Sequence, residues 1–454
     1  MMREMTLSEL QEPLQGKLLG EDVGFNSVFT DSRRPVDGGL FVALVGERFD
    51  GNDYVADIAD RGAAAALVSR PTGTALPQLC VRDTTIALGR LGALNRSEYK
   101  APLVGITGSS GKTTAKNLIQ AVLAQRGNTF ATVGNLNNEI GVPLTLLQLT
   151  PDTEFAVVEM GAGKLGDIAV LCAMGRPTVS VLLNVMPAHL EGMGSLQGIA
   201  QTKGEIFDGL GSGDVAVMNA DEPWVSSWRA RAGEARIIDF SLRADAAVRA
   251  TRIDSHGVSG TYFEAQTPDG PMHVMLPLPG VHNVANALAA AAVGLACGLS
   301  LVEITAGLES VAPVAGRLAI SCGALGAQLI DDCYNANPGS TRAAIDTLAA
   351  SAGKRTLVMG AMRELGSDSD AMHRELGVYA REAGLDQFWG VGEELREAVA
   401  AFGENGRWFV DTDAAVLAAQ AEFAAGDTVL IKGSRGARME RVLQALTPSA
   451  EEED

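Results

Sequence analysis

Apolar residues along much of the chain form short continuous runs separated by longer amphipathic stretches. In the first half the runs PLVGIT (102–107), EFAVVEM (154–160), PTVSVLLNV (177–185) and DVAVMN (214–219) alternate with helix-like segments. Strands buried on both faces of a parallel sheet have this pattern, and their alternation with helices indicates βαβ units. The pattern predicts a central α/β domain built on a mostly parallel sheet.

The regions on either side of these units have different patterns. From Val28 to Val81 short apolar segments alternate with turn-rich polar ones, which predicts a small N-terminal α/β module, and a helix is expected at 84–97. Residues 246–278 alternate apolar and polar positions, as antiparallel hairpins do, and a helix is expected at about 281–298. After residue 317 further strand–helix units predict a C-terminal Rossmann-like domain.

We therefore expect an α/β protein of three domains, with seams near residues 82 and 313. The length of 454 residues agrees, because single hydrophobic cores stop growing beyond about 250–300 residues. The expected domains are 1–82, 83–313 and 314–454.

The charge of the chain limits its possible partners, and its cysteines limit the kinds of covalent or metal site. The formal net charge is −19 and no run is rich in Lys or Arg, which argues against nucleic acid and anionic membranes as partners. No stretch reaches the roughly 20 apolar residues of a membrane-spanning helix. The five cysteines are scattered and never form a C-x-x-C pair, so neither a disulfide framework nor a zinc site is indicated. A reducing cytosol is the simplest setting.

The segment TGSSGKTT (107–114) follows the first central strand and precedes a helix-like stretch. Backbone amides at a helix N-terminus bind phosphate, because they lack partners and the helix dipole favours negative charge. Gly108 and Gly111 would let the backbone approach closely, Lys112 would reach the terminal phosphates, and Thr113 would bind Mg²⁺. The pattern predicts a phosphate-binding loop.

The match to the standard loop pattern is incomplete. The sequence G-x-x-x-x-G-K-[ST] would place glycine at the position of Ile106. A glycine-rich turn with an ordinary exposed lysine is the alternative interpretation.

A magnesium nucleotide also requires an acidic group near this loop. Glu159 ends a very apolar strand, where burying a carboxylate is costly unless it has a partner. If that strand lies beside the phosphate-loop strand, Glu159 is a candidate Mg²⁺ ligand. A rim carboxylate paired with a lysine is the alternative.

The next residues contain a second glycine pattern. GAGKLG (161–166) matches the G-x-G-x-x-G fingerprint of dinucleotide-binding enzymes. That fingerprint also requires Asp or Glu about twenty residues later, and VSVLLNV (179–185) contains neither. We therefore assign no dinucleotide site here.

Other candidates are weaker from position alone. His189 follows the strand 177–185 and would emerge at the same sheet edge as Lys112, or would be an ordinary loop histidine. Lys203 lies on the next expected helix, where most lysines are solvated. Asn283 and Asn286 would either cap the helix at 281–298 or serve a ligand.

Seven segments in order give the chain a resemblance to the Mur ligase family, from about residue 28 to 440. They are TGSSGKTT, VVEMGA, NVMPAHLEGMGS, TKGEIF, GVHNVANALAA, GR at 316–317 and DDCYNANPGS. The phosphate loop of this family is TG-x-x-GKTT, which resolves the mismatch at Ile106. The resemblance is strongest to the members that add D-alanyl-D-alanine to UDP-MurNAc-tripeptide. It is supported by FTDSRRPVDGGLFVALVGERFDGNDYV and TVGNLNNEIGVPLTLL.

The resemblance implies ATP-dependent amide formation in peptidoglycan precursor synthesis. The tripeptide carboxylate would take the γ-phosphoryl group of ATP, giving an acyl phosphate and ADP. The amine of D-alanyl-D-alanine would then attack it, giving UDP-MurNAc-pentapeptide and phosphate. Two Mg²⁺ ions, a monomeric chain and a cytoplasmic location are expected. The domain 1–82 would bind the UDP-linked substrate, 83–313 would bind ATP, and 314–454 would close on it.

The resemblance also implies roles for individual residues. The ATP phosphates would be held by Gly108, Ser109, Ser110, Gly111, Lys112, Thr113 and Thr114. Further nucleotide contacts would come from Asn283, Arg317, Asp332 and Asn335. The catalytic residues would be Lys112, Glu159, His189 and Lys203. Thr113 and Glu159 would bind one Mg²⁺, and His189 with Lys203 carbamylated by CO₂ would bind the second.

Substrate contacts are implied in the same way. Asp31, Ser32 and Arg33 match the uridine-diphosphate module, and Asn137 and Asn138 match the segment that holds the muramoyl group. The incoming dipeptide or the tripeptide end would contact Asn335, Asn337, Ser434 and Arg435. From position alone, Asp331 and Asp332 would instead be a solvated strand end.

Three alternatives remain open from the sequence. The chain would be another amino-acid-adding Mur ligase, a folylpolyglutamate-type ligase, or a phosphate-loop regulatory module without amide chemistry. Whether the accepted tripeptide ends in diaminopimelate or lysine is also open.

Overall fold

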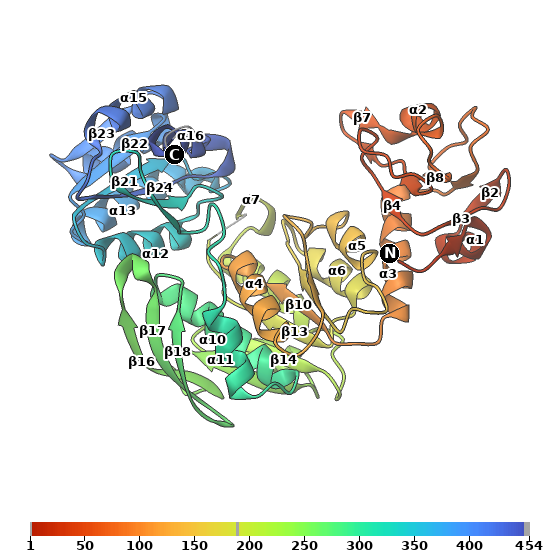
Figure 1. Ribbon diagram of the computed structural model, residues 1–454, viewed down its shortest axis with the longest axis horizontal. Helices are drawn as coiled ribbons and strands as arrows, with labels where there is room; N and C mark the ends of the chain where they lie inside the picture. Colours follow the sequence, from red (N-terminus) through yellow and green to blue (C-terminus); the bar gives the residue numbers. More distant parts are fainter. Residues whose placement is uncertain (1, 188–189, 449–454) are drawn as a thin grey trace.

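The computed structural model of the protein describes residues 2–187 and 190–448. Three α/β units follow one another along the molecule, with the central unit between the other two (Figure 1). The predicted α/β class and three-unit organisation are confirmed, while the seams at 82 and 313 stay predictions.

The N-terminal unit is built on a small sheet with strand order β2-β9-β8-β5-β4, in which β2 alone is antiparallel to its neighbour. Its strands are β2 (Lys17–Leu19), β4 (Val28–Phe29), β5 (Leu40–Val42), β8 (Ala65–Val68) and β9 (Gln78–Cys80). Two short antiparallel pairs join β1 (Met5–Thr6) to β3 (Gly24–Phe25) and β6 (Val45–Gly46) to β7 (Phe49–Asp50). The helices are α1 (Leu7–Leu14), α2 (Val55–Ala59) and α3 (Thr84–Glu98).

Helix α3 connects this unit to the central one. Its N-terminus is capped by the Asp83 carboxylate, which accepts hydrogen bonds from the amides of Thr85 and Ile86. Leu88 and Leu91 of α3 pack in the same hydrophobic cluster as Leu7 of α1. The connection is therefore a packed helix and not a flexible linker.

The central unit contains a sheet with strand order β11-β12-β10-β13-β14-β15-β16-β17-β18. Neighbours are parallel from β11 to β16 and antiparallel from β16 to β18. The parallel strands are β10 (Leu103–Thr107), β11 (Thr129–Ala131), β12 (Phe155–Glu159), β13 (Val179–Leu182), β14 (Val215–Asn219) and β15 (Arg236–Ser241). The predicted hairpins are formed by the strands β16 (Val248–Ser255), β17 (Thr261–Thr267) and β18 (Gly270–Leu276).

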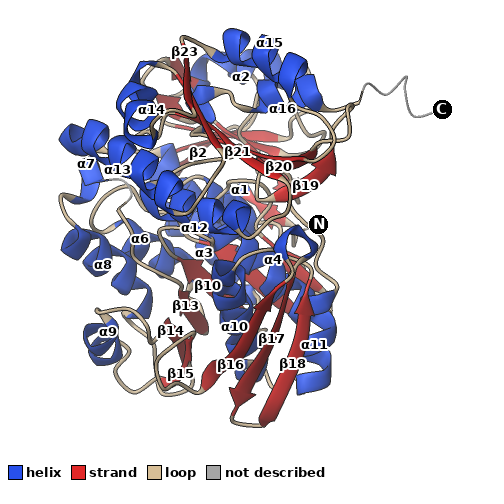
Figure 2. Cartoon of the chain, turned by 90° about the vertical axis from the view of Figure 1, so that its left-hand side faces the viewer, coloured by secondary structure: helices blue, strands red, loops and turns tan. Residues whose placement is uncertain are grey.

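Helices cover both faces of this sheet, as the side view shows (Figure 2). One face packs against α4 (Lys112–Leu123), α10 (Val281–Ala296) and α11 (Leu301–Glu309). The other face packs against α5 (Gly141–Leu146), α6 (Asp167–Gly175) and α9 (Val225–Arg231). The short helices α7 (Leu190–Met193) and α8 (Leu196–Gly204) follow β13. The central strands are buried on both sides, which explains their continuous apolar runs.

The C-terminal unit has the strand order β19-β20-β24-β21-β22-β23, parallel except for β19. Its strands are β19 (Ala319–Cys322), β20 (Gln328–Asp332), β21 (Lys354–Gly360), β22 (Gln387–Val391), β23 (Gly406–Phe409) and β24 (Asp427–Lys432). Its helices are α12 (Pro338–Ala349), α13 (Ser369–Glu382), α14 (Arg396–Phe402), α15 (Thr412–Glu422) and α16 (Glu440–Leu446). The predicted Rossmann-like arrangement is therefore present.

The expectations about disulfides and membrane-spanning helices can be compared with the described residues. All five cysteines are free thiols. A search of the described helices finds none that is long and apolar enough to cross a membrane.

Candidate functional site

The predicted phosphate loop connects β10 to α4 at the carboxyl end of the parallel sheet. Gly111 precedes the helix with φ +79°, and a Cβ atom there would lie 2.7 Å from the side-chain oxygen of Asn286. Both the backbone conformation and the close contact require glycine. The amides of residues 112–114 lie in the first turn of α4, where backbone N–H groups have no acceptor within the helix. A helix N-terminus of this kind suits an anion.

Residues 183–186, which we call the support segment, lie along the loop. The amide of Ser109 donates to the carbonyl of Asn184 at 3.1 Å. The amide of Ser110 donates to Asn184 Oδ1 at 2.9 Å, and Asn184 Nδ2 donates to the Ser110 carbonyl at 3.1 Å. The Ser109 hydroxyl bonds to both the amide and the carbonyl of Met186. The first half of the loop is thus fixed by hydrogen bonds to the support segment.

Glu159 lies beside this loop because β12 pairs in parallel with β10, with Glu159 opposite Ile106. The Glu159 side chain is almost fully buried. Its Oε2 accepts a hydrogen bond from the Thr113 hydroxyl at 3.1 Å, and its Oε1 accepts one from Asn137 Nδ2 at 2.9 Å. The structure therefore brings together two predicted Mg²⁺ ligands and one predicted substrate residue.

Two lysines near the loop have a lowered pKa. Burial lowers the pKa of Lys112, with Glu159 opposing this shift and Arg317 adding to it. The Lys112 ammonium donates to the Gly108 carbonyl at 2.8 Å. Lys203 is only 2% exposed at the end of α8. Burial, and then the charge of Lys112, lower the pKa of Lys203 well below its usual value. This buried position differs from the solvated one that the sequence favours for a lone helix lysine.

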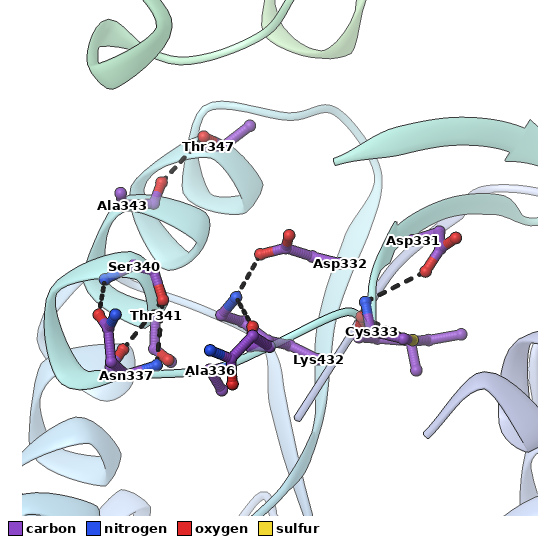
Figure 3. A network of polar contacts seen from close by, with 12 residues as sticks. Asp331, Asp332, Cys333, Ala336, Asn337, Ser340, Thr341, Ala343, Thr347 and Lys432 are labelled. Carbon is purple, nitrogen blue, oxygen red and sulfur yellow. Dashed lines mark hydrogen bonds and ion pairs between the residues drawn. The ribbon is translucent and has the colours of Figure 1, made fainter. Parts of the chain in front are cut away.

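The segment after β20 forms a polar network in the C-terminal unit (Figure 3). The buried ammonium of Lys432 pairs with the Asp332 carboxylate and donates to the Asn335 carbonyl at 3.0 Å. Asn337 caps α12 by accepting a hydrogen bond from the Ser340 amide at 2.8 Å. Ser434 is buried beside this network, where its hydroxyl accepts a hydrogen bond from the Arg363 amide.

A cavity of about 1060 Å³ joins these parts of the central and C-terminal units. The predicted residues that line it are Ser109, Ser110, Gly111, Lys112, Thr113, Thr114, Asn137, Asn138, Glu159, Asn283, Arg317, Asp332, Asn335 and Asn337. The Arg317 guanidinium lies over the Tyr334 ring, 4.1 Å from the ring centroid. Residues from two units therefore face one space large enough for a nucleotide and part of a second substrate.

Some predicted residues lie elsewhere. Asp31, Ser32 and Arg33 lie between β4 and β5 of the N-terminal unit, outside this cavity. Lys203, Ser434 and Arg435 are not among its lining residues either. His189 lies outside the described residues. The side chain of Asn283 donates to the Pro279 carbonyl at 2.8 Å, so it holds the start of α10 as well as lining the cavity.

The glycine pattern at 161–166 leads to a helix N-terminus that is already occupied. The Glu205 carboxylate accepts hydrogen bonds from the amides of Gly166 and Ala169, both at 3.0 Å. The Asp167 carboxylate accepts two more from Gly163 and Lys164. With carboxylates at these amides, the N-terminus of α6 is not available to a pyrophosphate.

Sequence reasoning missed several residues at this cavity. Asn184, Glu222, Lys432 and Tyr334 all line it. Each lies at or just beyond the carboxyl end of a parallel strand, which is the signal that would have found them. His282 also lines the cavity, and burial lowers its pKa to about 4, so its imidazole is neutral at neutral pH.

Two family models match the chain. The model described as "Mur ligase middle domain" matches residues 106–294, and the model described as "Mur ligase, glutamate ligase domain" matches residues 316–435. These ranges contain the phosphate loop and the Asp332 network respectively.

Similar proteins extend this match over nearly the whole chain. UDP-N-acetylmuramoyl-tripeptide–D-alanyl-D-alanine ligase of Escherichia coli (strain K12) is 45% identical, covering 98% of this chain and 99% of its own. The crystal structure of MurF from Acinetobacter baumannii is 35% identical, with a TM-score of 0.92 and 98% of each chain covered. MurF from Thermotoga maritima in complex with ADP is 29% identical, with a TM-score of 0.83, covering 92% of this chain and 96% of its own. The chain belongs to the Mur ligase family.

Proposed function

We propose that this protein is the ATP-dependent ligase that joins D-alanyl-D-alanine to UDP-MurNAc-tripeptide. The products are UDP-MurNAc-pentapeptide, ADP and phosphate, in peptidoglycan precursor synthesis. The observation that carries the proposal is the single cavity lined by Lys112, Thr113 and Glu159 together with Asp332 and Asn335. The similarity to relatives that are named for this reaction supports it.

The residues of the cavity suit phosphoryl transfer, which depends mainly on positioning and charge stabilisation. The amides of residues 112–114 and the Lys112 ammonium would bind the β- and γ-phosphates of ATP. Arg317 would add a second cation from the C-terminal unit, and Asp332 would accept hydrogen bonds from the ribose. The tripeptide carboxylate then attacks the γ-phosphorus and ADP leaves. The dipeptide amine attacks the resulting acyl phosphate, and phosphate leaves.

The oxygens of Thr113 and Glu159 suit a magnesium ion. Mg²⁺ prefers oxygen ligands and usually takes one or two from protein, with water and substrate phosphates completing its shell. Within residues 2–187 and 190–448 no group of three or more His, Cys, Asp or Glu side chains is arranged to hold a metal ion. Thr113 and Glu159 would hold one Mg²⁺, which would neutralise charge that develops during phosphoryl transfer.

A second ion would be held by His189 and a carbamylated Lys203. A buried lysine with a lowered pKa is largely a neutral amine, which adds to CO₂ and releases one proton to give a carbamate. The carbamate replaces a cation by an anionic oxygen ligand. The burial of Lys203 and the direction of its pKa fit this modification.

The remaining substrate groups are assigned to the other residues that the family pattern identifies. Asp31, Ser32 and Arg33 would bind the uridine diphosphate, while Asn137 and Asn138 hold the muramoyl group. The dipeptide would meet Asn335, Asn337, Ser434 and Arg435 in the C-terminal unit, which we expect to close further when the substrates bind. We place the reaction in the cytoplasm, where ATP and UDP-linked precursors are available, and expect a monomer.

Phosphate release from ATP tests this function. UDP-MurNAc-tripeptide is supplied with D-alanyl-D-alanine, single amino acids or glutamate, and the nucleotide product is weighed by mass spectrometry. A product heavier by one dipeptide unit is expected with D-alanyl-D-alanine alone. If the rate of phosphate release depends on neither the UDP-linked substrate nor any amine, the result would contradict the proposal and favour a regulatory phosphate-loop module.

A further inference from the structure

The first half of the phosphate loop is held by a segment more than 70 residues away in the sequence. Asn184 lies two residues after β13, and the sequence predicts that the strand continues to residue 185. The strand instead ends at Leu182, and the chain turns toward the loop. The support segment, residues 183–186, then bonds with Ser109 and Ser110 through side chains and backbone together.

Asn184 makes a reciprocal pair with one residue of the loop. Its side-chain oxygen accepts from the Ser110 amide at 2.9 Å, and its side-chain nitrogen donates to the Ser110 carbonyl at 3.1 Å. A carboxamide matches the backbone N–H and C=O of one residue in this way because it carries a donor and an acceptor side by side. Alanine offers neither group, and aspartate offers only the acceptor.

The far side of the support segment is held as well. The amide of Val185 donates to Glu222 Oε1 at 3.1 Å, and Asn219 Nδ2 donates to the carbonyl of Leu183 at 3.0 Å. Asn219 ends β14 and Glu222 follows three residues later, so both positions are set by the neighbouring strand of the sheet. The support segment therefore lies between a rigid strand end and the phosphate loop.

We propose that Asn184 is a positioning residue for nucleotide binding, which sets the shape of the phosphate loop through its paired hydrogen bonds to Ser110. The inference rests on the proposed function for the identity of the ligand. Because Asn184 occupies the amide of Ser110, the phosphates are bound by the amides that follow Gly111. Asn184 prepares this second half of the loop by fixing the first.

Asn95 provides a matched control. It is buried, and its side chain donates two hydrogen bonds to backbone carbonyls, those of Leu146 at 2.8 Å and Leu149 at 3.2 Å. Asn95 does not line the cavity. Asn95→Ala and Asn184→Ala each remove two hydrogen bonds to the backbone, but only the second removes contacts to the phosphate loop.

The experiment measures the Kd for MgADP by titration calorimetry, together with the Tm of each protein. Two net hydrogen bonds correspond to a loss of about tenfold to thirtyfold in an equilibrium constant. Asn184→Ala is expected to weaken MgADP binding by about this factor and to raise the KM for ATP, with the KM for UDP-MurNAc-tripeptide changed less than twofold. Asn95→Ala is expected to lower the Tm without changing the Kd.

A folded Asn184→Ala protein with a Kd within twofold of wild type would overturn the proposal. If this variant does not fold, Asn184→Ser decides the question, since it replaces the carboxamide that pairs with the amide and the carbonyl of Ser110 by a short neutral hydroxyl. Weaker MgADP binding by Asn184→Ser supports the proposal, and unchanged binding overturns it.

These outcomes are distinct from a failure of the proposed function. A wild-type protein that binds MgADP but forms no amide would contradict the ligase assignment, and the comparison of variants would still test Asn184. A wild-type protein that does not bind MgADP would contradict both.

Discussion

The phosphate loop and the N-terminal segment 31–33 are both assigned to phosphate groups, but they are built differently. The phosphate loop lies at the end of a buried strand, and Thr113 and Ser110 are each held by another part of the central unit. The Arg33 side chain is 86% exposed, and its guanidinium pairs with Asp31 through two hydrogen bonds of 2.8 and 2.9 Å. This hydrogen bonding lowers the pKa of Asp31 to about 2.

The difference shows two ways to prepare an anion site. The phosphate loop is held by hydrogen bonds to the support segment that leave the amides of residues 112–114 to a ligand. Arg33 would have to exchange an intramolecular carboxylate for a ligand oxygen, so part of the new interaction would only replace an old one. Changes in the first region should therefore have larger effects than equivalent changes in the second.

The largest effect is expected from Lys112→Ala. Removing the cation at the transferring phosphoryl group should lower turnover by about a thousandfold. Phosphate release in the presence of both substrates measures the loss. Lys354→Ala is the control, since Lys354 is a surface lysine 3.8 Å from Glu422. Turnover by Lys112→Ala within tenfold of wild type would contradict the role of this lysine.

A somewhat smaller effect is expected from Lys203→Ala. Loss of a carbamate ligand should reduce activity by about a hundredfold, and a short carboxylic acid such as acetate should partly restore it by supplying the missing oxygens. The same acid should not restore Lys112→Ala. Full activity of Lys203→Ala would rule out the carbamate.

Arg33→Ala tests the other side of the comparison. We expect the KM for UDP-MurNAc-tripeptide to rise about tenfold. The loss of an arginine with no intramolecular partner would raise this KM further, whereas Asp31 already competes with the substrate for Arg33. The KM for ATP should not change. Arg70 is a matched control, as it pairs with Asp50 at 2.9 Å in the same unit. Equal effects of Arg33→Ala and Arg70→Ala would indicate a general change in the N-terminal unit.

The smallest expected effect is on the stability of the protein, through Glu222, which bonds to the support segment. Burial raises the pKa of Glu222 to about 7, from an ordinary value of 4.5, with the Val185 amide opposing the shift and Asp221 adding to it. Between these values the native state keeps a proton that the unfolded chain has released. Stability therefore falls as pH rises through this window, and the loss is complete above about pH 7.

Glu222→Gln should remove this loss while keeping an oxygen for the Val185 amide. The variant should be more stable than wild type at pH 8, by about 2 kcal/mol, and no more stable at pH 4.5. Thermal unfolding at the two pH values measures the difference. If Glu222→Gln and wild type differ in Tm by the same amount at pH 8 and at pH 4.5, the raised pKa of Glu222 would be contradicted.

The sequence predicted those parts of the site that lie within one strand–loop–helix unit. TGSSGKTT predicts a phosphate loop because its glycines, lysine and threonine all lie within that unit. Glu159 was expected beside the loop only if strand 154–160 neighbours the loop strand, and this condition is met because β12 pairs in parallel with β10. Predicted strands such as 154–160 and 214–219 agree with β12 and β14 to within one or two residues.

Contacts that depend on strand order were not predictable in the same way. Lys432 reaches Asp332 because β24, the last strand made, inserts between β20 and β21. No local pattern encodes that insertion. Asn184 was read as part of a strand since LLNV is a continuous apolar run with one polar residue, and its pairing with Ser110 is visible only in three dimensions.

The order of strands in the central sheet also has a consequence for synthesis on the ribosome. β10 emerges before both of its neighbours, since it pairs with β12 and β13. A nascent chain that ends before residue 155 therefore leaves both edges of this buried strand unpaired, and one that ends before residue 179 still leaves one edge unpaired. An unpaired strand edge is a hazard for aggregation. The N-terminal sheet is complete once Cys80 has been made, so it can fold during this interval. The phosphate loop must wait for about 75 further residues before its supporting partners exist.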